Sequence, residues 1–402
     1  MIQPTRVMLL LSSLHGGGAE RVAAHLVNRC DPQLVDVRLG LLRRAGPFIG
    51  DVAADRIHTP SFGEDLLAFE GHNSSFYRPD RLIAGAVLAP AAIAGMIKAH
   101  RPEVVMSFLK GISVLTAFVV RGMGVRRPRW IAREGNNTDA VIDDELANPA
   151  ARSLIKGLTR RCYRSADCFL ANSWEMANGL TRDLGLDKAR VRVINNPIDV
   201  AHVQAMAQRP IEGDVPSRPF IVNVGRLEYQ KGQDVLLEAY AKSRASSTHD
   251  LVIVGRGTAE AGLRALANEL GVGDRVHFPG FSTNPWSWVA RASLFVLPSR
   301  WEGFPTAVAE ALACGAPALV TSCDYGPAEV LEHGVSGWVV PPEDPAAFGA
   351  AMDMLLETPA LRERLGAAGP ARAAAFDIQR MVDAYTSLFL EQAEAQRLAV
   401  TA

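Results

Sequence analysis

The sequence predicts an α/β protein built from two doubly wound domains, each with a parallel sheet that helices cover on both faces. Short apolar runs alternate with longer segments of helical periodicity, which is typical of parallel sheets buried on both faces. The alternation is interrupted by a proline-rich stretch at residues 208–219 and then starts again, which indicates a linker between two domains. The length of 402 residues also favours two or three domains.

In the first half of the chain, five short segments predict strands. They cover residues 7–11, 35–42, 104–108, 130–133 and 168–171, and residues 190–194 end this unit. Helical periodicity covers residues 19–30 and 81–99. A kink or break is expected at Pro90, because proline lacks the amide donor that a helix interior needs.

The second half repeats this pattern. Strands are predicted over residues 220–224, 251–254, 275–278, 294–297 and 318–321. Helices are predicted from Gln233, from Ala259, at Pro305, which suits a first helical turn, and from about Asp344 onward. We therefore expect an N-terminal domain at 1–205, a C-terminal domain at 206–375 and a last helix, 376–402, that packs back on the N-terminal domain.

Composition favours a soluble protein of the reducing cytosol. Hydrophobic residues make up 48% of the chain and charged residues 21%, which is ordinary for a globular protein. The five cysteines are odd in number and include no C-x-x-C pair, so a disulfide framework and structural zinc are not expected. The run at 7–11 is too short for the apolar part of a signal peptide, and the apolar stretch at 82–97 is too short for a membrane span.

Charge is unevenly distributed along the chain. Residues 1–200 carry a net charge of +6 and the remainder −7. The basic half suits an anionic membrane surface or a phosphate-bearing acceptor, although simple variation between two domains explains it equally well. The basic residues at 156–164 follow helical spacing and could touch anionic lipid or form a solvated helix face. No basic run is interleaved with aromatics, so nucleic acid is not an expected partner.

The most informative stretch runs from Glu302 to Glu310. The first glutamate lies on a loop after an apolar strand, and the second lies one turn into the following helix. The N–H groups at such a helix start favour a phosphate, and the two carboxylates can accept hydroxyl protons from a sugar and from a ribose. A sugar nucleotide has these three parts, but a solvated loop glutamate and a helix-face glutamate are the alternative.

Two further loops follow predicted strands and carry cations or glycines. Arg226 and Lys231, after Gly225, can clamp a diphosphate, unless they are two surface cations near a helix start. The glycines at 16–18 let the backbone approach a ligand closely. Gly255-Arg256-Gly257 lacks the third glycine of a dinucleotide fingerprint, so Arg256 either lines the ligand site or belongs to a plain tight turn.

A polar cluster around Glu134 ends another predicted strand and could face a sugar or an acceptor, or form a capped, solvated loop. No Asp-x-Asp or histidine-rich pattern suggests a metal site. Because ligands of doubly wound sheets bind at the carboxyl ends of the strands, a cleft between the two domains is the expected site.

These motifs together resemble the retaining glycosyltransferases of family 4, which have the GT-B fold. The resemblance rests on Gly-Gly-Ala-Glu at 17–20, Gly225-Arg226-Leu227 with Lys231-Gly232, and Glu302-Gly303-Phe304-Pro305 with Glu310. It spans nearly the whole chain in the right order. The segment 322–329 is also similar to members that build bacterial surface glycans, some of which use UDP-galactose or UDP-N-acetylgalactosamine.

The resemblance implies a role for each motif residue. Arg226 and Lys231 would hold the diphosphate, with Gly225 and Arg256 beside them, and Gly17 and Gly18 would approach from the other domain. Glu302 would bind the donor sugar and Glu310 the ribose. Gly303 and the backbone of Phe304, Pro305 and Thr306 would line the phosphate end, and Phe281 would lie beside the base. Many members have a histidine where this chain has Glu134, which is a candidate catalytic residue.

The implied activity is transfer of a hexose or N-acetylhexosamine from a nucleotide sugar, expected to be UDP-linked, to a lipid-linked or surface-polysaccharide acceptor. Configuration would be retained, a leaving-phosphate oxygen would take the acceptor's proton, and neither metal nor cofactor would be needed. The protein would act in the cytoplasm, on the inner face of the cytoplasmic membrane, on a polyprenyl-diphosphate-linked acceptor. A nucleotide-sugar epimerase or hydrolase and a non-catalytic sugar-nucleotide-binding protein are the alternatives.

Overall fold

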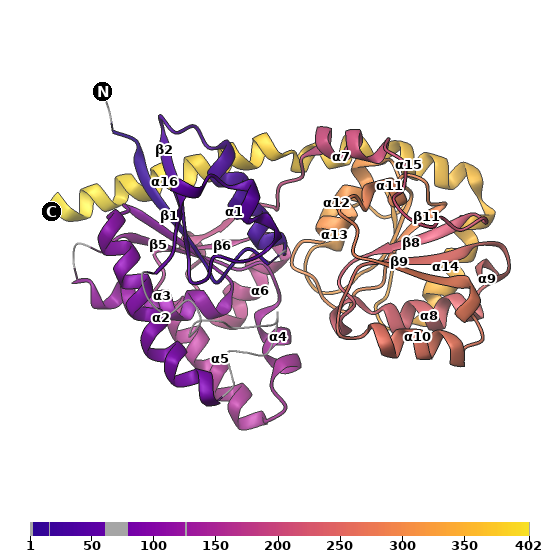
Figure 1. Cartoon of the computed structure of the whole chain (residues 1–402), viewed down its shortest axis with the longest axis horizontal. Helices are drawn as coiled ribbons and strands as arrows, with labels where there is room; N and C mark the ends of the chain where they lie inside the picture. The colour runs from indigo at the N-terminus through magenta and orange to yellow at the C-terminus, as the bar shows by residue number, and fades with distance from the viewer. Residues whose placement is uncertain (1–2, 16, 61–78, 125–126, 402) are drawn as a thin grey trace. The chain divides into compact units, whose positions relative to one another are not determined.

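The computed structural model describes residues 3–15, 17–60, 79–124 and 127–401. The chain forms two compact units, one made of Met1–Asn196 with Gln379–Ala402 and the other of Pro197–Ile378. Each unit is a parallel sheet with helices on both faces (Figure 1), so the predicted pair of doubly wound domains is confirmed.

The N-terminal unit contains a seven-stranded parallel sheet in the order β3-β2-β1-β4-β5-β6-β7. Its strands are β1 (Thr5–Leu11), β2 (Val35–Leu41), β3 (Ile57–His58), β4 (Val104–Phe108), β5 (Arg129–Arg133), β6 (Cys168–Ala171) and β7 (Val191–Val193). Its helices are α1 (Gly18–Arg29), α2 (Pro79–His100), α3 (Lys110–Gly122), α4 (Thr138–Glu145), α5 (Pro149–Tyr163), α6 (Trp174–Leu184) and α16 (Ile378–Thr401). Pro90 lies inside α2, which continues through it, so the alternative of a break at this proline is wrong.

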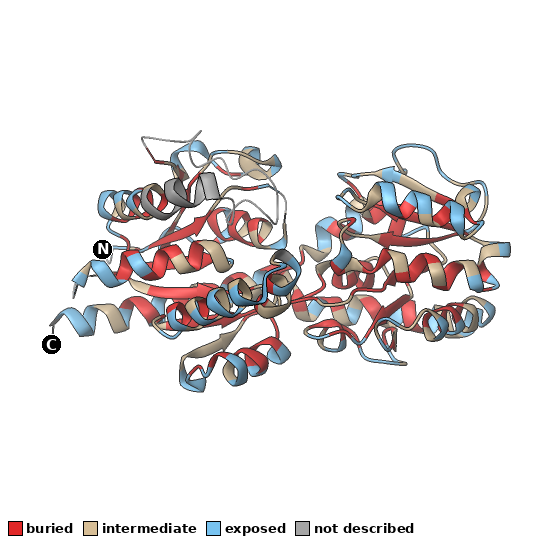
Figure 2. Ribbon diagram, turned by 90° about the horizontal axis from the view of Figure 1, so that it is seen from below, coloured by how far each residue is buried: buried red, intermediate tan, exposed pale blue. Residues whose placement is uncertain are grey.

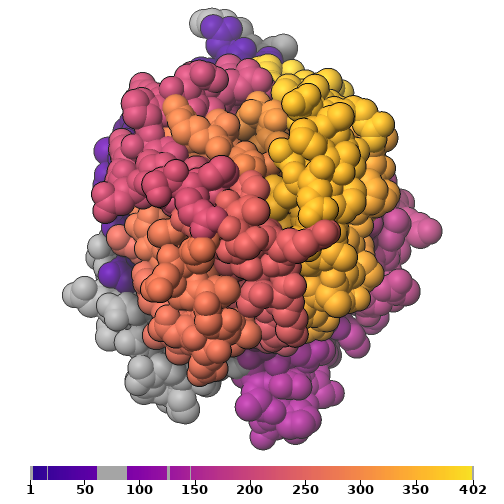
Figure 3. Space-filling model, turned by 90° about the vertical axis from the view of Figure 1, so that its right-hand side faces the viewer, coloured from indigo at the N-terminus to yellow at the C-terminus, as the bar shows by residue number. Residues whose placement is uncertain are grey.

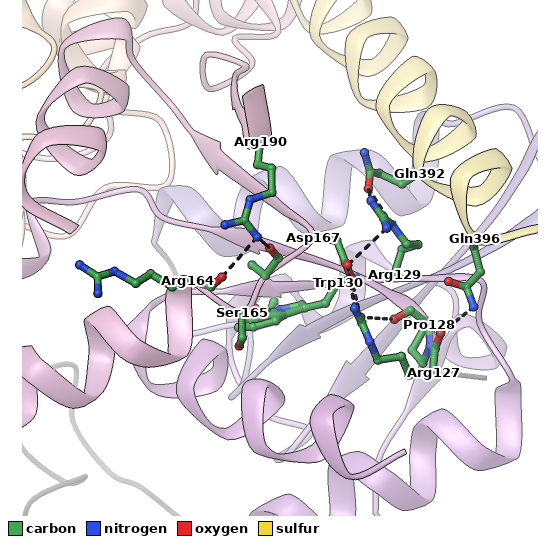
Figure 4. Close-up of polar contacts among 12 residues, drawn as sticks. Arg127, Pro128, Arg129, Trp130, Arg164, Ser165, Asp167, Arg190, Gln392 and Gln396 are labelled. Carbon is green, nitrogen blue, oxygen red and sulfur yellow. Dashed lines mark hydrogen bonds and ion pairs between the residues drawn. The ribbon is translucent and has the colours of Figure 1, made fainter. Parts of the chain in front are cut away.

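The last helix, α16, is fastened to the N-terminal unit at the amino-terminal end of β5 (Figure 4). Arg127 forms a two-pronged ion pair with Asp167, at 2.5 and 2.7 Å. Arg129 donates to the amide oxygen of Gln392 at 3.3 Å, and Gln396 donates to the Arg127 carbonyl at 2.7 Å. Side chains of α16 thus complete hydrogen bonds that the strand ends offer.

The C-terminal unit contains a six-stranded parallel sheet in the order β10-β9-β8-β11-β12-β13. Its strands are β8 (Phe220–Val224), β9 (Asp250–Val254), β10 (Val276–Gly280), β11 (Leu294–Leu297), β12 (Ala318–Thr321) and β13 (Trp338–Val340). Its helices are α7 (Val200–Ala207), α8 (Gln233–Lys242), α9 (Ala245–Thr248), α10 (Glu260–Glu269), α11 (Trp286–Val289), α12 (Thr306–Ala313), α13 (Pro327–Val330), α14 (Pro345–Glu357) and α15 (Pro359–Ala373).

Strand side chains alternate between two apolar layers in this unit. Phe220 and Val222 pack on one face of the sheet with α7, α11 and α12, whereas Ile221 packs on the other with α8 and α14. The sheet is therefore buried on both faces, as the red strands in Figure 2 show. Figure 3 views this unit in space-filling form, with the gold and yellow atoms of the neighbouring α14 and α15 along one side.

The proline-rich stretch at 208–219 is not the linker between the units, contrary to prediction. The chain passes from one unit to the other at Asn196–Pro197 and returns at Ile378–Gln379, so the boundaries predicted at 205 and 375 also shift. Residues 208–219 connect α7 to β8, and Ile211 packs against the core of the C-terminal unit. A connection inside a domain can have the same composition as a linker between domains.

In the described part of the chain, no helix combines the length and apolar character that a membrane crossing requires.

Candidate active site

The predicted donor residues gather at the carboxyl edge of the C-terminal sheet. The loop that carries Arg226 and Lys231 follows β8, and the loop that carries Glu302 follows β11. These two strands are neighbours, with the order of strands reversing between them. Ligands of doubly wound sheets bind at this kind of reversal. The structure therefore places three predicted site residues where the fold favours a ligand.

Lys231 and Glu302 form a direct ion pair. The Lys231 Nζ lies 2.5 Å from Glu302 Oε1, and the Ser299 hydroxyl donates to the same oxygen at 2.7 Å. The two charged side chains are only 16% and 6% exposed. Because both charges are largely removed from water, each depends on the other. A sugar hydroxyl and a phosphate oxygen could share this paired carboxylate and ammonium.

Arg226 is held by a neutral partner. Its Nη2 donates to Oε1 of Gln230 at 2.9 Å. The Gln230 amide nitrogen donates in turn to the Trp301 carbonyl at 2.9 Å, next to Glu302. Gln230 therefore joins the two loops of the site, and the sequence analysis missed it because this glutamine forms no recognisable motif with residues 71 positions away.

Glu310 lies in α12 and is mostly buried. Burial, and next the charge of Glu310, raises the pKa of the Cys314 thiol to about 12. Pro305, predicted in the first turn, is instead the residue that caps α12, with φ −74° and ψ 83°, so the helix begins at Thr306. The N–H groups of Thr306 and Val308 already donate to the carbonyls of Phe304 and Pro305. The start of α12 thus has fewer free donors for a phosphate than the sequence predicted.

The loop around Gly303 and Phe304 is fixed from two sides. The Phe304 ring packs in the core, edge-on to Phe376 with ring centroids 5.1 Å apart. On the other side lies the loop after β12, where Gly326 has φ 103° and an added Cβ would lie 2.9 Å from the Gly303 carbonyl oxygen. The Glu302 N–H also donates to the Asp324 carbonyl at 3.2 Å. Backbone packing against this third loop thus positions Glu302.

Arg256 and Phe281 extend the edge toward β9 and β10. Arg256 follows β9 and lies beside Gly280, where an added Cβ would be 3.7 Å from its Nε. Phe281 follows β10 and its side chain is 60% exposed. Gly225 lies against the aliphatic part of the Lys231 side chain: a Cβ added at Gly225 would be 3.7 Å from Lys231 Cδ. An exposed aromatic ring at this edge is available to stack on a base.

In the N-terminal unit, Gly17 and Gly18 lie at the start of α1, and Gly16 lies outside the described residues. A Cβ added at Gly17 would lie 2.5 Å from Oε2 of Glu20. The glutamate in the first turn therefore occupies space beside the glycine loop. The approach of this loop to a phosphate or sugar, and the cleft between the units, stay predictions.

Glu134 is buried beneath its loop, only 3% exposed. Its Oε2 accepts from the Thr138 hydroxyl at 3.0 Å, and burial raises its pKa to about 7, against the opposing effects of Tyr163 and Thr138. The side chain therefore lies in the interior of the N-terminal unit and is not solvated, although the loop after it is capped by Asn137, which accepts from the Ala140 N–H at 3.1 Å. Its catalytic role stays a prediction.

The neighbouring Arg133 is a residue whose structural role the sequence did not reveal. Its buried guanidinium donates from Nε to the Tyr385 hydroxyl at 2.9 Å and from Nη2 to Asn196 Oδ1 at 2.6 Å. It also lies over the Phe108 ring. Arg133 thus ties β5 to α16 and to Asn196, the residue where the chain leaves this unit.

Replacing Glu134 by Gln is expected to stabilise the protein more at high pH than at low pH. The folded-state pKa is raised, so the folded protein favours the protonated acid, and stability is lost as pH rises from about 4.3 through 7. Glutamine keeps an acceptor for Thr138 but never ionises. In urea unfolding, the difference in free energy of unfolding between variant and wild type should increase by on the order of 3 kcal/mol from pH 5 to pH 8, in favour of the variant. An equal difference in free energy of unfolding at both pH values would contradict a raised pKa for the Glu134 carboxyl.

Two family models match the chain. One described as glycosyl transferases group 1 matches residues 206–372, and one described as glycosyltransferase family 4 matches residues 16–202. The first therefore covers the edge that carries Arg226, Lys231 and both glutamates, and the second covers the glycine loop and Glu134.

Curated relatives carry glycosyltransferase names, and a solved structure shows the same fold. A Campylobacter jejuni N-acetylgalactosamine-N,N'-diacetylbacillosaminyl-diphospho-undecaprenol 4-alpha-N-acetylgalactosaminyltransferase is 29% identical over 67% of this chain and 74% of its own length. A lipopolysaccharide core biosynthesis glycosyltransferase of Rhizobium meliloti, LpsE, is 27% identical over 92% of this chain and 95% of its own. The structure of Anabaena HepE in complex with UDP has the same fold, with a TM-score of 0.72 and 17% identity over 96% of this chain and 100% of that one.

Proposed function

The chain belongs to the family 4 glycosyltransferases, and on that premise we propose that it moves a hexose or N-acetylhexosamine from a UDP-sugar to a lipid-linked or surface-polysaccharide acceptor. The observation that carries this proposal is the cluster of Arg226, Lys231 and Glu302 at the strand-order reversal of the C-terminal sheet. It offers two cations for a diphosphate and a carboxylate for sugar hydroxyls. Similarity to a relative named for a diphospho-undecaprenol substrate, and to HepE bound to UDP, supports the choice of acceptor and nucleotide.

The charges at this edge suit departure of a nucleoside diphosphate. Breaking the bond between the sugar and the diphosphate leaves an oxocarbenium-like sugar and an anionic leaving group. Preorganised cations stabilise charge that develops in the transition state. Arg226 is bound by a neutral amide, so its positive charge is not cancelled by that partner. Lys231 is a second cation at this edge, and its charge is partly balanced by Glu302, the carboxylate that would bind the sugar.

In the proposed mechanism the anomeric configuration is retained and no metal is required. Arg226 and Lys231 supply the positive charge that a metal ion gives other transferases. An oxygen of the departing phosphate takes the proton of the attacking acceptor hydroxyl, so no protein base is needed. Glu302 binds and orients the sugar and does not form a covalent intermediate. Glu310 binds the ribose, and Phe281 stacks on the base.

The test is a donor panel with product analysis. Purified protein is incubated with UDP-, GDP- and ADP-linked sugars, with and without an undecaprenyl-diphosphate-linked sugar acceptor, and the anomeric configuration of the product is read by NMR. Transfer to the acceptor with retention is expected. An epimerised or free sugar formed without acceptor would instead support an epimerase or hydrolase. Nucleotide binding without turnover would support a binding protein.

We extend the proposal to contact of the N-terminal unit with the inner face of an anionic membrane. On α5, Leu154 is 71% exposed and Arg161 is exposed nearby in sequence. However, Lys156 is paired with Asp143 of α4 at 2.8 Å, so part of the basic charge predicted for this helix is neutralised. Electrostatic attraction to anionic lipid should therefore be modest and sensitive to salt.

Flotation with liposomes containing phosphatidylglycerol is expected to recover the protein at low salt and to lose it at high salt. Leu154→Glu removes the exposed apolar side chain and adds a negative charge, so it should reduce recovery severalfold without lowering the melting temperature. Liposomes of neutral lipid serve as the control. Equal recovery of wild type and variant, or no recovery at low salt, would contradict contact through α5.

A further inference from the structure

In the loop after β8, the side-chain amide of Gln230 forms hydrogen bonds through both its oxygen and its nitrogen. Its Oε1 accepts from Arg226 Nη2, and its Nε2 donates to the Trp301 carbonyl, both at 2.9 Å. Its own carbonyl accepts from the Arg300 N–H at 2.8 Å. The residue is mostly buried, so these bonds form away from bulk water.

These bonds place Gln230 beside three charged groups of the proposed donor site. Arg226 is bound directly, Lys231 is the next residue in the chain, and Trp301 precedes Glu302. A change at Gln230 therefore acts on both loops, which are also joined by the ion pair of Lys231 with Glu302. Arg226 is the group that depends on it most, because its guanidinium lies at the end of a long, rotatable side chain.

We infer that Gln230 is a positioning residue that orients the Arg226 guanidinium toward the donor diphosphate. This inference rests on the proposed function. An amide is well suited to the task, because its oxygen fixes one edge of the guanidinium without neutralising it. The other edge and the full positive charge stay available to phosphate oxygens. A carboxylate at this position would hold Arg226 as an ion pair and compete with the phosphate.

The same reasoning explains why glutamine and glutamate are not equivalent here. A glutamate at 230 could still accept from Arg226, but its second oxygen would face the Trp301 carbonyl in place of the donated N–H. Two acceptors would then oppose each other in a buried position, which is unfavourable. Gln230→Glu should weaken donor binding although the side chain keeps its shape.

The experiment measures the dissociation constant of UDP by calorimetry, the melting temperature, and kcat and KM for the donor. For Gln230→Leu and Gln230→Glu we expect UDP to bind about tenfold more weakly or worse, as for the loss of one hydrogen bond to a charged group. In an Arg226→Ala background, Gln230→Leu should have little further effect on UDP binding, because its target is gone. Two independent variants keep the test informative if one does not fold.

Gln392→Leu is the matched control. This buried glutamine also accepts from an arginine, Arg129, but in the N-terminal unit (Figure 4). Its loss should lower the melting temperature and leave UDP affinity unchanged. Wild-type affinity in folded Gln230→Leu, or full additivity with Arg226→Ala, would overturn the inference alone. Failure of the wild-type protein to bind UDP, GDP or ADP would overturn the proposed function and the inference with it.

Discussion

Glu302→Gln and Lys231→Ala are each expected to reduce sugar transfer by about 10²–10³-fold, which corresponds to roughly 2.7–4 kcal/mol of transition-state stabilisation. The two groups are 2.5 Å apart and little exposed, so each would contact the sugar-nucleotide donor directly, away from bulk water. Glu302→Gln keeps an acceptor oxygen for Ser299 and removes the charge, with an NH2 donor in place of the second oxygen. Lys231→Ala also leaves a buried carboxylate without its cation, so it should lower the melting temperature as well.

Steady-state kinetics with the preferred UDP-sugar would measure these effects, alongside melting temperatures. The double variant should be little worse than the poorer single variant, because the two groups act as a unit. Asp353→Asn is a suitable control: Asp353 pairs with Arg244 and accepts the N–H groups of Arg244 and Ala245, on helices α14 and α9. It should lose stability and keep transfer activity. Full activity in both site variants would contradict the assignment of the donor site.

The fold was predictable because its signals are local and repeated. Many of the buried strands are apolar runs, and Glu302 follows one of them, so its place on a loop before a helix could be predicted directly. For Glu302 and Lys231, the sequence could predict only that the two residues lie near each other at one edge of the sheet. The 2.5 Å distance between them depends on how two loops fold, which a motif does not specify.

The errors arise where local sequence is ambiguous. The prolines at 208–219 mark an irregular segment but do not say whether it joins two domains or two elements of one. The polar residues around Glu134 suggest an exposed loop, yet the carboxyl turns inward to Thr138. Gln230 and the Asp324–Gly326 loop were missed because their importance lies in contacts between segments distant in sequence.

Gly255→Ala is expected to be the most destabilising single substitution considered for this chain. Gly255 has φ 153°, and a Cβ added there would lie 1.8 Å from the Gly225 carbonyl oxygen. The oxygen belongs to the backbone and the position of a Cβ is fixed by the backbone, so neither atom can rotate away. The N–H of Gly255 also donates to the Gly280 carbonyl at 2.9 Å, and that of Gly225 to the Val254 carbonyl at 3.0 Å. A loss of more than about 4 kcal/mol follows, because the loops after β8, β9 and β10 would have to separate.

A close approach of the same kind accounts for the second glycine of the Gly255-Arg256-Gly257 turn. The glycines are needed because one loop's backbone lies against another's, and a Cβ at Gly257 would likewise lie 2.1 Å from the Leu227 carbonyl oxygen. Gly262→Ala in α10 is the matched control, since an added Cβ meets nothing within 4 Å. It should be neutral or stabilise the helix by about 0.5–1 kcal/mol. A soluble Gly255→Ala protein with the wild-type melting temperature would show that the two loops do not touch. That result would also contradict the positions assigned to Gly225 and Arg226.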